Sequence, residues 1–491
     1  MAGFQPTPPR QYSTDTLQAV PADTVRRMDT DPQQTSRVDA CMAWLRARID
    51  GRVFRAGARV PSVRELARML GVSPFTAAIA YERLAAAGMI EARRGSGYYV
   101  RELASPATRP SAPSSQVDLK WLMQQMLDSG RAARGTGLGV LPAAWLDGDA
   151  LGATLRAIGR EGPGRLLEGG TAHGYAPLRE VLARRLGAFG IVAHAEQIVL
   201  TTGITQAIHL VLQTLVAPGD TVLVLDPSWF GALGMLALRG ARVVGMPYAA
   251  SGPDLDALDA IAQDTRPRLL LLNSVAQNPT GLALDASTVS RILQIAKKHD
   301  FHVLEDDVYA DLCDPALPRL AAHDGFERVI YAGGYSKTLA ANLRVGYLAS
   351  SDTLATAFAD TKVLTGYTTP EVNERALHKL LANGRYARHV AALRERLGTH
   401  RRKALRLIER EGFAIYGRPE HGLFAWVDMA CDTNELALRG RERGLLVAPG
   451  SLFSPTQRAS RFMRYNVSTP ADAALRELFV LARQLARTAR V

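Results

Sequence analysis

The sequence is poor in cysteine and contains no long apolar run. Its 491 residues include three cysteines, Cys41, Cys313 and Cys431, which are scattered without a metal-type spacing. We therefore expect a reducing environment, with neither a disulfide framework nor a metal site. No run of about 18 apolar residues occurs, and the N-terminus MAGFQPTPPRQYSTDT lacks the apolar segment of a secretory signal. The sequence predicts a cytoplasmic protein with no membrane span.

Positive charge is concentrated in one short part of the chain. Residues 37–101 contain twelve arginines and five acidic residues, which leaves +7 of the total formal charge of +12. Residues 1–36 have a net charge of −1, and the remaining 390 residues carry +6. Such a concentration of arginine is typical of a domain that binds a polyanion. A solvated face on an arginine-rich protein is the alternative, and charge alone does not separate the two.

Length and local composition indicate several parts, because 491 residues exceed one typical core. Residues 1–36 are polar and predict a disordered tail, and the Pro/Ser/Ala-rich residues 102–118 predict a linker. From 119 to 491, short apolar runs alternate with helical patterns such as 287–299, which favours an α/β domain with a largely parallel sheet. The predicted strands are 221–225, 269–272, 301–304, 328–332 and 345–349.

Two short helices joined by a glycine turn are predicted within residues 37–101. The first begins with a capping box, in which Ser62 and Glu65 bond free amides at the helix start. Its apolar face carries Val63, Leu66, Ala67 and Leu70. Gly71 ends this helix, and Ser73 caps the second one. The inner face of the second helix carries Ala77, Ala80, Tyr81 and Leu84. This pattern is typical of a helix-turn-helix.

The segment after the second helix predicts a wing. Gly88 closes the helix, and MIEARRGSGYYV (89–100) reads as a hairpin with a Gly-Ser-Gly tip. The stretches PSVRELARMLGVS and AYERLAAAGMIEARRGSGYYV resemble the winged helix of GntR-type bacterial transcription regulators. The resemblance implies that the second helix enters the major groove. It implies DNA contacts from Arg64, Ser73, Thr76, Arg93 and Arg94. Pro74 stands where many relatives carry arginine, and a winged helix used only for protein contacts is the alternative.

A second set of polar residues lies just past the C-termini of predicted strands, where ligands bind in open α/β sheets. Asn278-Pro279-Thr280-Gly281 comes after strand 269–272, and Glu305-Asp306-Asp307-Val308-Tyr309 after strand 301–304. Lys337 comes after strand 328–332, and Arg344 lies seven residues beyond it. Pyridoxal 5'-phosphate (PLP) needs a lysine, an acid for its pyridine nitrogen, donors for its phenolate oxygen and an anion site for its phosphate. The sequence offers each of these groups.

The order of these residues resembles that of class I/II aminotransferases of fold type I, over about residues 120–491. The resemblance implies that Lys337 forms the internal aldimine with PLP and that Asp306 pairs with the pyridinium. It implies that Asn278 and Tyr309 bond the phenolate oxygen, and that Arg464 binds a ligand carboxylate. The other cofactor-binding residues that it implies are Gly203, Ile204, Thr205, Trp229, Ser336 and Arg344.

Two positions depart from the family pattern. Gly334 stands where relatives usually place a phosphate-binding serine, and Gly169 where many have a tyrosine that reaches the partner subunit. The loss of two hydroxyl donors predicts weaker PLP binding, by about 1 kcal/mol per hydrogen bond. Each site residue also has a simpler interpretation: a turn at Asn278, a strand-end salt bridge at Asp306, core packing at Trp229 and an ion pair at Arg464. Their conjunction in one order favours PLP.

A GntR-type winged helix joined by a linker to an aminotransferase-like domain resembles the MocR subfamily of transcription regulators. The resemblance implies a homodimer, often head-to-tail, and a large α/β domain with a smaller C-terminal α/β subdomain. The leading hypothesis is a regulator that binds operator DNA and senses an amino compound, or PLP itself, through an aldimine at Lys337. The alternatives are an active aminotransferase with an accessory winged helix and an inert dimeric scaffold that binds DNA. The sequence leaves the effector, the operator and transaminase turnover open.

Overall fold

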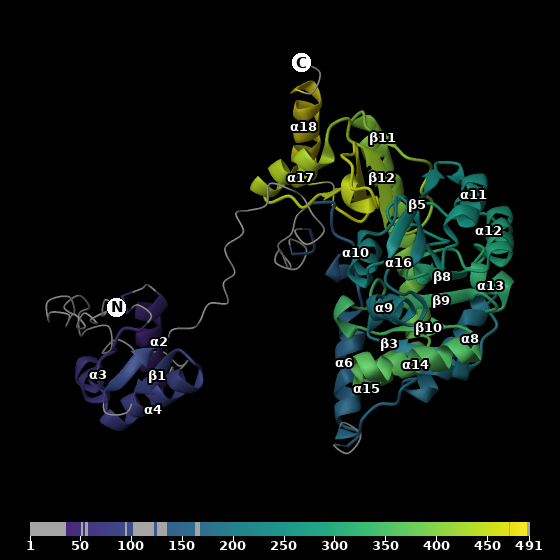
Figure 1. Cartoon of the computed structure of the whole chain (residues 1–491). Helices are drawn as coiled ribbons and strands as arrows, with labels where there is room; N and C mark the ends of the chain where they lie inside the picture. The colour runs from purple at the N-terminus through teal and green to yellow at the C-terminus, as the bar shows by residue number, and fades with distance from the viewer. Residues whose placement is uncertain are drawn as a thin grey trace, which may run out of the picture. The chain divides into compact units, whose positions relative to one another are not determined.

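The computed structural model describes residues 36–50, 53–54, 57–93, 96–101, 122–124, 135–162, 167–470 and 472–488. The chain divides into two compact units, Met1–Ser114 and Ser115–Val491 (Figure 1). The predicted tail, apart from Ser36, and the predicted linker 102–118 lie outside the described residues. Within the described ranges, no helix is both long and apolar enough to cross a membrane.

The described part of the N-terminal unit contains three helices and a hairpin. They are α2 (Arg37–Asp50), α3 (Val63–Leu70), α4 (Pro74–Ala86), β1 (Ile90–Arg93) and β2 (Gly97–Val100). The predicted capping box is confirmed, because the Ser62 hydroxyl accepts the Glu65 amide proton at 3.2 Å and the Glu65 carboxylate accepts the Ser62 amide proton at 3.3 Å. Gly71 ends α3 with φ of 66° in the left-handed region, where glycine is favoured. Helix α2 was not anticipated as an element.

The core of this unit follows the predicted apolar faces. Ala77, Ala80, Tyr81 and Leu84 of α4 are fully buried, as is Leu66 of α3. The hairpin after α4 is confirmed as an antiparallel pair whose register runs from Ile90 opposite Val100 to Arg93 opposite Gly97. Arg94, at the predicted tip, lies outside the described residues. The unit is therefore a winged helix.

An eight-stranded sheet forms the centre of the second unit, in the order β3-β10-β9-β8-β7-β4-β5-β6. The strands β5, β4, β7, β8 and β9 are parallel, whereas β10 runs antiparallel to β3 and β9 and β6 antiparallel to β5. All five predicted strands exist, with ends shifted by at most two residues. The strands are β3 (Ile198–Thr201), β4 (Thr221–Asp226), β5 (Arg242–Ala249), β6 (Gly252–Pro253), β7 (Leu269–Leu272), β8 (His302–Asp306), β9 (Val329–Gly334) and β10 (Gly346–Ala349).

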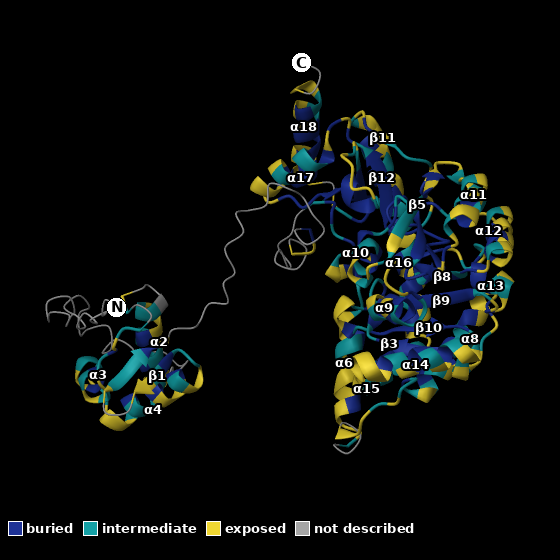
Figure 2. Cartoon of the chain, viewed as in Figure 1, coloured by how far each residue is buried: buried dark blue, intermediate teal, exposed yellow. Residues whose placement is uncertain are grey.

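Helices cover both faces of this sheet (Figure 1). Alternate residues of a strand point to opposite faces, so Val222 and Val224 of β4 belong to one apolar cluster and Leu223 and Leu225 to the other. The first cluster includes α9 (Gly203–Leu215), α10 (Phe230–Arg239) and α14 (Asp352–Gly366). The second includes α6 (Gly148–Gly159), α8 (Ala176–Leu186), α11 (Leu255–Thr265), α12 (Ala286–His299), α13 (Leu320–Asp324) and α15 (Glu371–Ala382). Figure 2 shows the strands buried between these layers.

A smaller antiparallel sheet follows in the C-terminal part, with strand order β11-β12-β14-β13. Its strands are β11 (Ala414–Ile415), β12 (Phe424–Asp428), β13 (Ala448–Pro449) and β14 (Phe462–Asn466). The helices of this part are α16 (Arg385–Arg410), α17 (Thr433–Glu442) and α18 (Ala473–Thr488). The predicted α/β domain with a smaller C-terminal subdomain is confirmed.

Candidate functional site

The predicted cofactor residues gather at one edge of the large sheet. Asp306 is the last residue of β8, and Lys337 comes three residues after the end of β9. Asn278 follows β7 by six residues. The expectation that every such group follows a strand is wrong for Arg344, which lies two residues before the start of β10. Because β10 runs antiparallel, its beginning lies at the same edge as the carboxyl ends of the parallel strands.

Lys337 is a half-buried amine near several charged groups. Its Nζ donates a hydrogen bond to the Gly139 carbonyl at 2.7 Å and lies 5.9 Å from the ring centroid of Tyr309. Burial, followed by the positive charge of Arg464, lowers the pKa of Lys337 to about 8, although Asp306 acts in the opposite direction. A lysine with this pKa is partly neutral near pH 7, which is the form that attacks an aldehyde.

Asp306 is a buried acid that forms no ion pair with the described residues. Its Oδ1 accepts the Val308 amide proton at 3.2 Å, and the ion pairs of the described residues do not include its carboxylate. Burial raises its pKa to about 6, although the charge of Lys337 acts in the opposite direction. A protonated pyridine nitrogen beside the carboxylate would supply a positive charge. The site therefore fits the acid that PLP requires.

Asn278 connects the predicted phenolate donors with the predicted carboxylate site. Its Nδ2 donates to the Tyr309 hydroxyl at 3.3 Å, and its Oδ1 accepts a hydrogen bond from Arg464 Nη1 at 3.2 Å. Arg464 is 1% exposed, and its Nη2 donates to the Gly137 carbonyl at 2.7 Å. Its Nε has no partner among the described residues, and its guanidinium lies 4.4 Å from the ring of Phe424. Burial lowers the pKa of Arg464 to about 10.

The predicted phosphate site lies where β3 leads into α9. No side chain caps the N-terminus of α9, so its first amides and the helix dipole can face an anion. Arg344 Nη2 donates to the Thr202 carbonyl at 2.9 Å. A Cβ on Gly203 would lie 2.9 Å from that same nitrogen, so glycine allows the guanidinium to reach the helix start. Ile204 is buried and Thr205 is exposed.

Among the described residues, no hydrogen bond or ion pair joins Trp229, Ser336 or Thr205 to the other predicted cofactor residues. Trp229 is half-buried at the start of α10, and its ring centroid lies 6.4 Å from that of Phe230. Ser336 is half-buried beside Lys337. Among the described residues, the bonds link Asn278, Tyr309 and Arg464 directly, and the roles of Trp229 and Ser336 stay predictions.

Sequence reasoning missed residues 135–140 (GTGLGV), here called the glycine segment. Its carbonyls at Gly137 and Gly139 accept the bonds from Arg464 and Lys337 described above. Asn466 Nδ2 donates to the carbonyls of Leu138 and Val140, each at 2.9 Å. A Cβ on Gly137 would lie 3.0 Å from the backbone of residue 446. The alternate glycines were the available signal, because they permit such close backbone approach.

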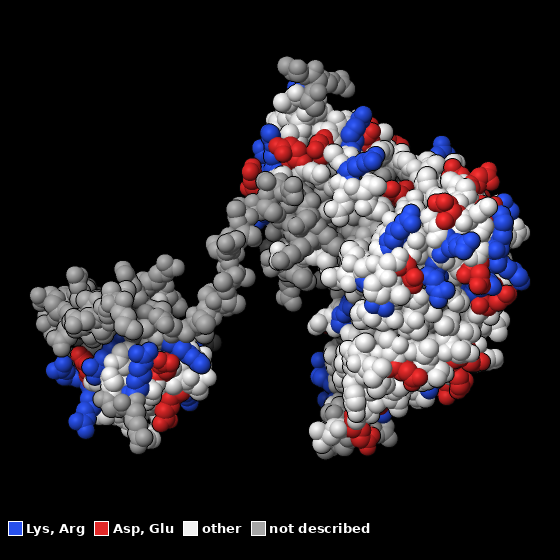
Figure 3. Space-filling view, in the orientation of Figure 1, with Lys and Arg blue, Asp and Glu red and all other residues white. Residues whose placement is uncertain are grey.

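The residues predicted to contact DNA differ in whether their side chains already bond other groups of the N-terminal unit. Arg64 is exposed on α3. The hydroxyls of Ser73 and Thr76 bond each other at 2.8 Å, and Ser73 also accepts the Thr76 amide proton at 3.0 Å, so both serve the start of α4. Arg93 forms an ion pair with Glu91 at 2.8 Å and lies over a tyrosine ring. Figure 3 shows basic and acidic groups interspersed on the visible face of this unit.

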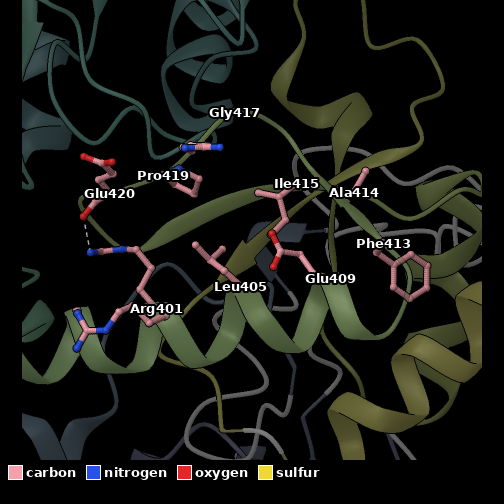
Figure 4. Close-up of a pocket in the computed structure, with 12 residues that line it drawn as sticks. Arg401, Leu405, Glu409, Phe413, Ala414, Ile415, Gly417, Pro419 and Glu420 are labelled. Atoms are coloured by element: carbon pink, nitrogen blue, oxygen red, sulfur yellow. Dashed lines mark hydrogen bonds between the residues drawn. The ribbon is translucent and has the colours of Figure 1, made fainter.

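A pocket of about 670 Å³ lies elsewhere, between α16, β11 and the loop 417–420 (Figure 4). Arg401 reaches across it from α16 and donates to the Glu420 carbonyl at 2.5 Å. Neither Lys337 nor Arg464 lines this pocket. Its position therefore gives no support to a role in the predicted chemistry.

Comparison with known proteins shows two family matches. Residues 146–479 match the family of class I and II aminotransferases, and residues 39–100 match the gntR family of bacterial regulatory proteins. Among curated relatives, the uncharacterized HTH-type transcriptional regulator YdcR of Escherichia coli is 28% identical, over 86% of this chain and 93% of its own. The probable rhizopine catabolism regulatory protein MocR of Rhizobium meliloti is 29% identical, over 73% and 74%.

A solved structure of similar fold contains a cofactor adduct. LysN, the alpha-aminoadipate aminotransferase of Thermus thermophilus, was solved with N-(5'-phosphopyridoxyl)-L-leucine. It is 27% identical, with a TM-score of 0.68 over 75% of this chain and 96% of its own. The covered share of this chain is close to the size of the larger unit, so the likeness concerns the fold of that unit.

Proposed function

Because this chain belongs to the family of class I and II aminotransferases and also carries the GntR-type domain of MocR-type regulators, we propose that it is a PLP-dependent transcription regulator. Residues 37–101 bind double-stranded operator DNA, and the larger unit binds PLP. The signal is a small molecule with an amino group, or PLP itself, bound at Lys337. The family matches support a transcription regulator with an aminotransferase-like domain. The cofactor, the signal and the roles of the site residues are proposed.

The candidate residues fit PLP by charge and hydrogen-bonding type. Lys337 supplies the amine, Asp306 the negative charge for the pyridine nitrogen, and Asn278 with Tyr309 the donors for the phenolate oxygen. Arg344 and the first amides of α9 supply the anion site for the phosphate. PLP contributes an aldehyde, which exchanges one amine for another and thereby binds amino compounds covalently.

The regulatory proposal rests on the hydrogen bonds of the glycine segment. It accepts hydrogen bonds from Lys337 and from Arg464, the two groups assigned to the amine and the carboxylate of an amino-acid ligand. A ligand that engages both groups competes with Gly139 and Gly137 for the same donors. The glycine segment follows the predicted linker along the chain. Ligand binding can thus favour one arrangement of the segment over another, as a regulated equilibrium requires.

A spectroscopic experiment tests the cofactor half of the proposal. Purified protein with added PLP is expected to gain absorbance near the visible edge, and Lys337→Ala is expected to lose it. Borohydride reduction followed by mass spectrometry should place the pyridoxyl group on Lys337. Lys362→Ala serves as a control, because this second buried amine bonds the Leu200 carbonyl and lies outside the candidate site. Absence of the absorbance band from wild-type protein would refute PLP binding.

A binding experiment tests the DNA half. Arg64→Ala is expected to weaken binding to the protein's own promoter region and to reduce the salt slope by about 1, as the loss of one phosphate contact does. Arg242→Ala removes the same charge from an exposed position of β5 and should leave both values unchanged. An unchanged affinity and slope for Arg64→Ala would remove this residue from the DNA contacts.

We also infer a homodimer, arranged head-to-tail. Two winged helices suit a repeated operator, since the symmetry of a dimer is mirrored in its binding site. The end of α14 supports an association surface, because Leu364 is 87% exposed and Tyr367 is 73% exposed. Sedimentation of wild type and of Leu364→Glu tests this, with a shift of the variant towards monomer expected.

Catalytic turnover is the second candidate function. Lys337 and Asp306 are both present, with shifted pKa values of about 8 and about 6, so proton transfer on a bound amino acid is chemically possible. Steady-state assays with common amino and keto acids separate the two functions. Rapid turnover together with DNA binding that is weak and insensitive to salt would favour the enzyme.

A further inference from the structure

The first turn of α4 exposes an aromatic ring, which lies outside the apolar core formed by the described residues of its unit. Phe75 is the second residue of the helix and is 75% exposed. It is absent from the apolar core of the described part of the N-terminal unit and from the partly buried residues packed against that core. Removing such a ring from water is favourable, so this position is suited to a binding surface.

The first two turns of α4 carry no charged side chain, and the exposed Glu82 lies farther along, at i+7 from Phe75. Ala78 and Ile79, at i+3 and i+4 from Phe75, are half-buried. Arg83 is the arginine of this helix, and it lies 3.6 Å from Asp39 in an ion pair. Arginine and amide side chains are the usual readers of guanine and adenine. The leading turns of α4 therefore offer an apolar surface instead of polar base-reading groups.

The charges that can hold phosphates come from the neighbouring helix. Arg64 and Arg68 of α3 lie at i and i+4, so they share one helix face, and both are exposed. The unit thus combines basic groups on α3 with an exposed ring on α4. Phosphate contacts position a protein on DNA, whereas sequence is read at the base edges.

We propose that Phe75 recognises the C5-methyl group of thymine in the major groove, so that the protein selects T·A pairs through apolar contact. The thymine methyl is the apolar group that base edges present in this groove. This inference rests on the proposed binding of DNA through α4, and it names the base that this helix reads. A ring inserted between base steps is the competing outcome, which is typical of minor-groove wedges and does not depend on the methyl group.

Deoxyuridine provides a direct test, because it differs from thymidine only by that methyl group. Promoter duplexes of one sequence are prepared with thymine or with deoxyuridine, and the full-length protein is titrated against each. Wild type is expected to bind the deoxyuridine duplex about 4-fold more weakly for each contact that is lost. In a dimer that makes one such contact in each half-site, the two losses of affinity multiply. Phe75→Ala is expected to bind the two duplexes equally, whereas Phe75→Leu keeps part of the difference.

Two matched variants control the experiment. Val53→Ala removes another exposed apolar side chain, 54% exposed, from the same unit and should keep the wild-type preference. Arg64→Ala should weaken binding to both duplexes by the same factor, as a phosphate contact does. Thermal unfolding of Phe75→Ala should match wild type, because the ring contacts no core residue among those described.

The outcomes separate this inference from the proposed function. If wild type shows no specific binding to the thymine duplex, the regulator's proposed DNA contact through α4 fails. If wild type binds specifically but equally to both duplexes, DNA binding stands and methyl recognition by Phe75 is overturned. A thymine preference that persists in Phe75→Ala overturns it as well and assigns the preference to another residue.

Discussion

Two buried arginines in the larger unit have opposite surroundings. Arg319 is 0% exposed, and its Nε donates to the carboxylate of Asp307 at 3.1 Å. Its Nη1 donates to the carbonyls of Asp314, Pro315 and Leu317. Arg464 is 1% exposed, but its partners are the Asn278 side chain and the Gly137 carbonyl. No ion pair among the described residues includes Arg464.

The pKa shifts of the two arginines differ in direction for this reason. Burial acts to lower the pKa of Arg319, yet attraction to Asp307 and Tyr331 raises it overall. Burial lowers the pKa of Arg464 to about 10, because only Tyr309 opposes it. A buried charge without a counter-ion is unfavourable by itself. Within the described residues Arg319 has a carboxylate partner, although its Nη2 and Asp307 Oδ1 are buried without hydrogen bonds, whereas Arg464 has no carboxylate partner.

The largest expected effect concerns stability at Arg319. The substitution Arg319→Met leaves Asp307 buried without its cation, which should lower the free energy of unfolding by about 3–5 kcal/mol. Urea unfolding of the two variants tests the comparison, with Arg464→Met expected to change stability by less than about 1 kcal/mol. Equal losses in Arg319→Met and Arg464→Met would show that both arginines are structural.

A smaller effect is expected for ligand binding at Arg464. A panel of amino acids is first titrated against PLP-loaded protein to find the one that changes its absorbance most. Arg464→Met should weaken the binding of that amino acid by about 2–4 kcal/mol, or roughly 30- to 1,000-fold. The amine obtained by decarboxylating that amino acid serves as the control ligand. Its affinity should stay the same in wild type and variant, as measured by spectral titration. A parallel loss for both ligands would contradict a carboxylate contact.

The position of the candidate site at the edge of the large sheet could be predicted, because each strand there is an apolar run followed directly by polar residues. Lys337 lies three residues after β9 and Asp306 is the last residue of β8, so chain order alone placed them near one another. The bond from Lys337 to Gly139 spans 198 residues, and that from Arg464 to Gly137 spans 327. No local pattern reports such contacts, because they depend on how the glycine segment packs against parts of both sheets that are distant in the sequence.

At the winged helix, the sequence predicted Ser73 as the cap of α4, and this cap is confirmed. The sequence did not show that the Thr76 hydroxyl bonds the Ser73 hydroxyl. Arg93 has the charge but is paired with Glu91. The strands β3, β5, β6, β11, β12, β13 and β14 were not predicted. For the two-residue strands β6, β11 and β13 the reason is that periodicity needs more than one repeat to be visible.

The rate at which Lys337 reacts with PLP is expected to change tenfold per pH unit below the pKa of the lysine. Burial and Arg464 hold the pKa of Lys337 at about 8, below the ordinary value of 10.5. The neutral amine fraction, and with it the rate of PLP attachment, should fall tenfold per unit below pH 8 and level off above it. Between pH 8 and 10.5 the unfolded chain holds a proton that the folded chain lacks, so this lysine makes stability rise with pH there.

Stopped-flow absorbance across this pH range measures the midpoint. Arg464→Met should move the midpoint upward, because it removes one of the charges that lower the pKa of Lys337. Neutralisation of an exposed arginine such as Arg242 should leave it unchanged. A rate that continues to climb up to pH 10.5 would indicate an amine with an ordinary pKa, outside the influence of burial and Arg464.

The smallest expected effect is a gain in PLP affinity at Gly334, a position with space for a side chain. A Cβ there would have its nearest neighbour, the Val345 carbonyl oxygen, at 3.7 Å. Gly334→Ser should therefore fold normally and tighten PLP binding by about 1 kcal/mol, or roughly 5-fold, if the new hydroxyl bonds the phosphate. Gly333→Ser is the matched control, because its Cβ would lie 2.5 Å from the ring of Tyr347 and should destabilise the protein. Equal PLP affinity in wild type and Gly334→Ser, measured by fluorescence titration, would place the phosphate away from this residue.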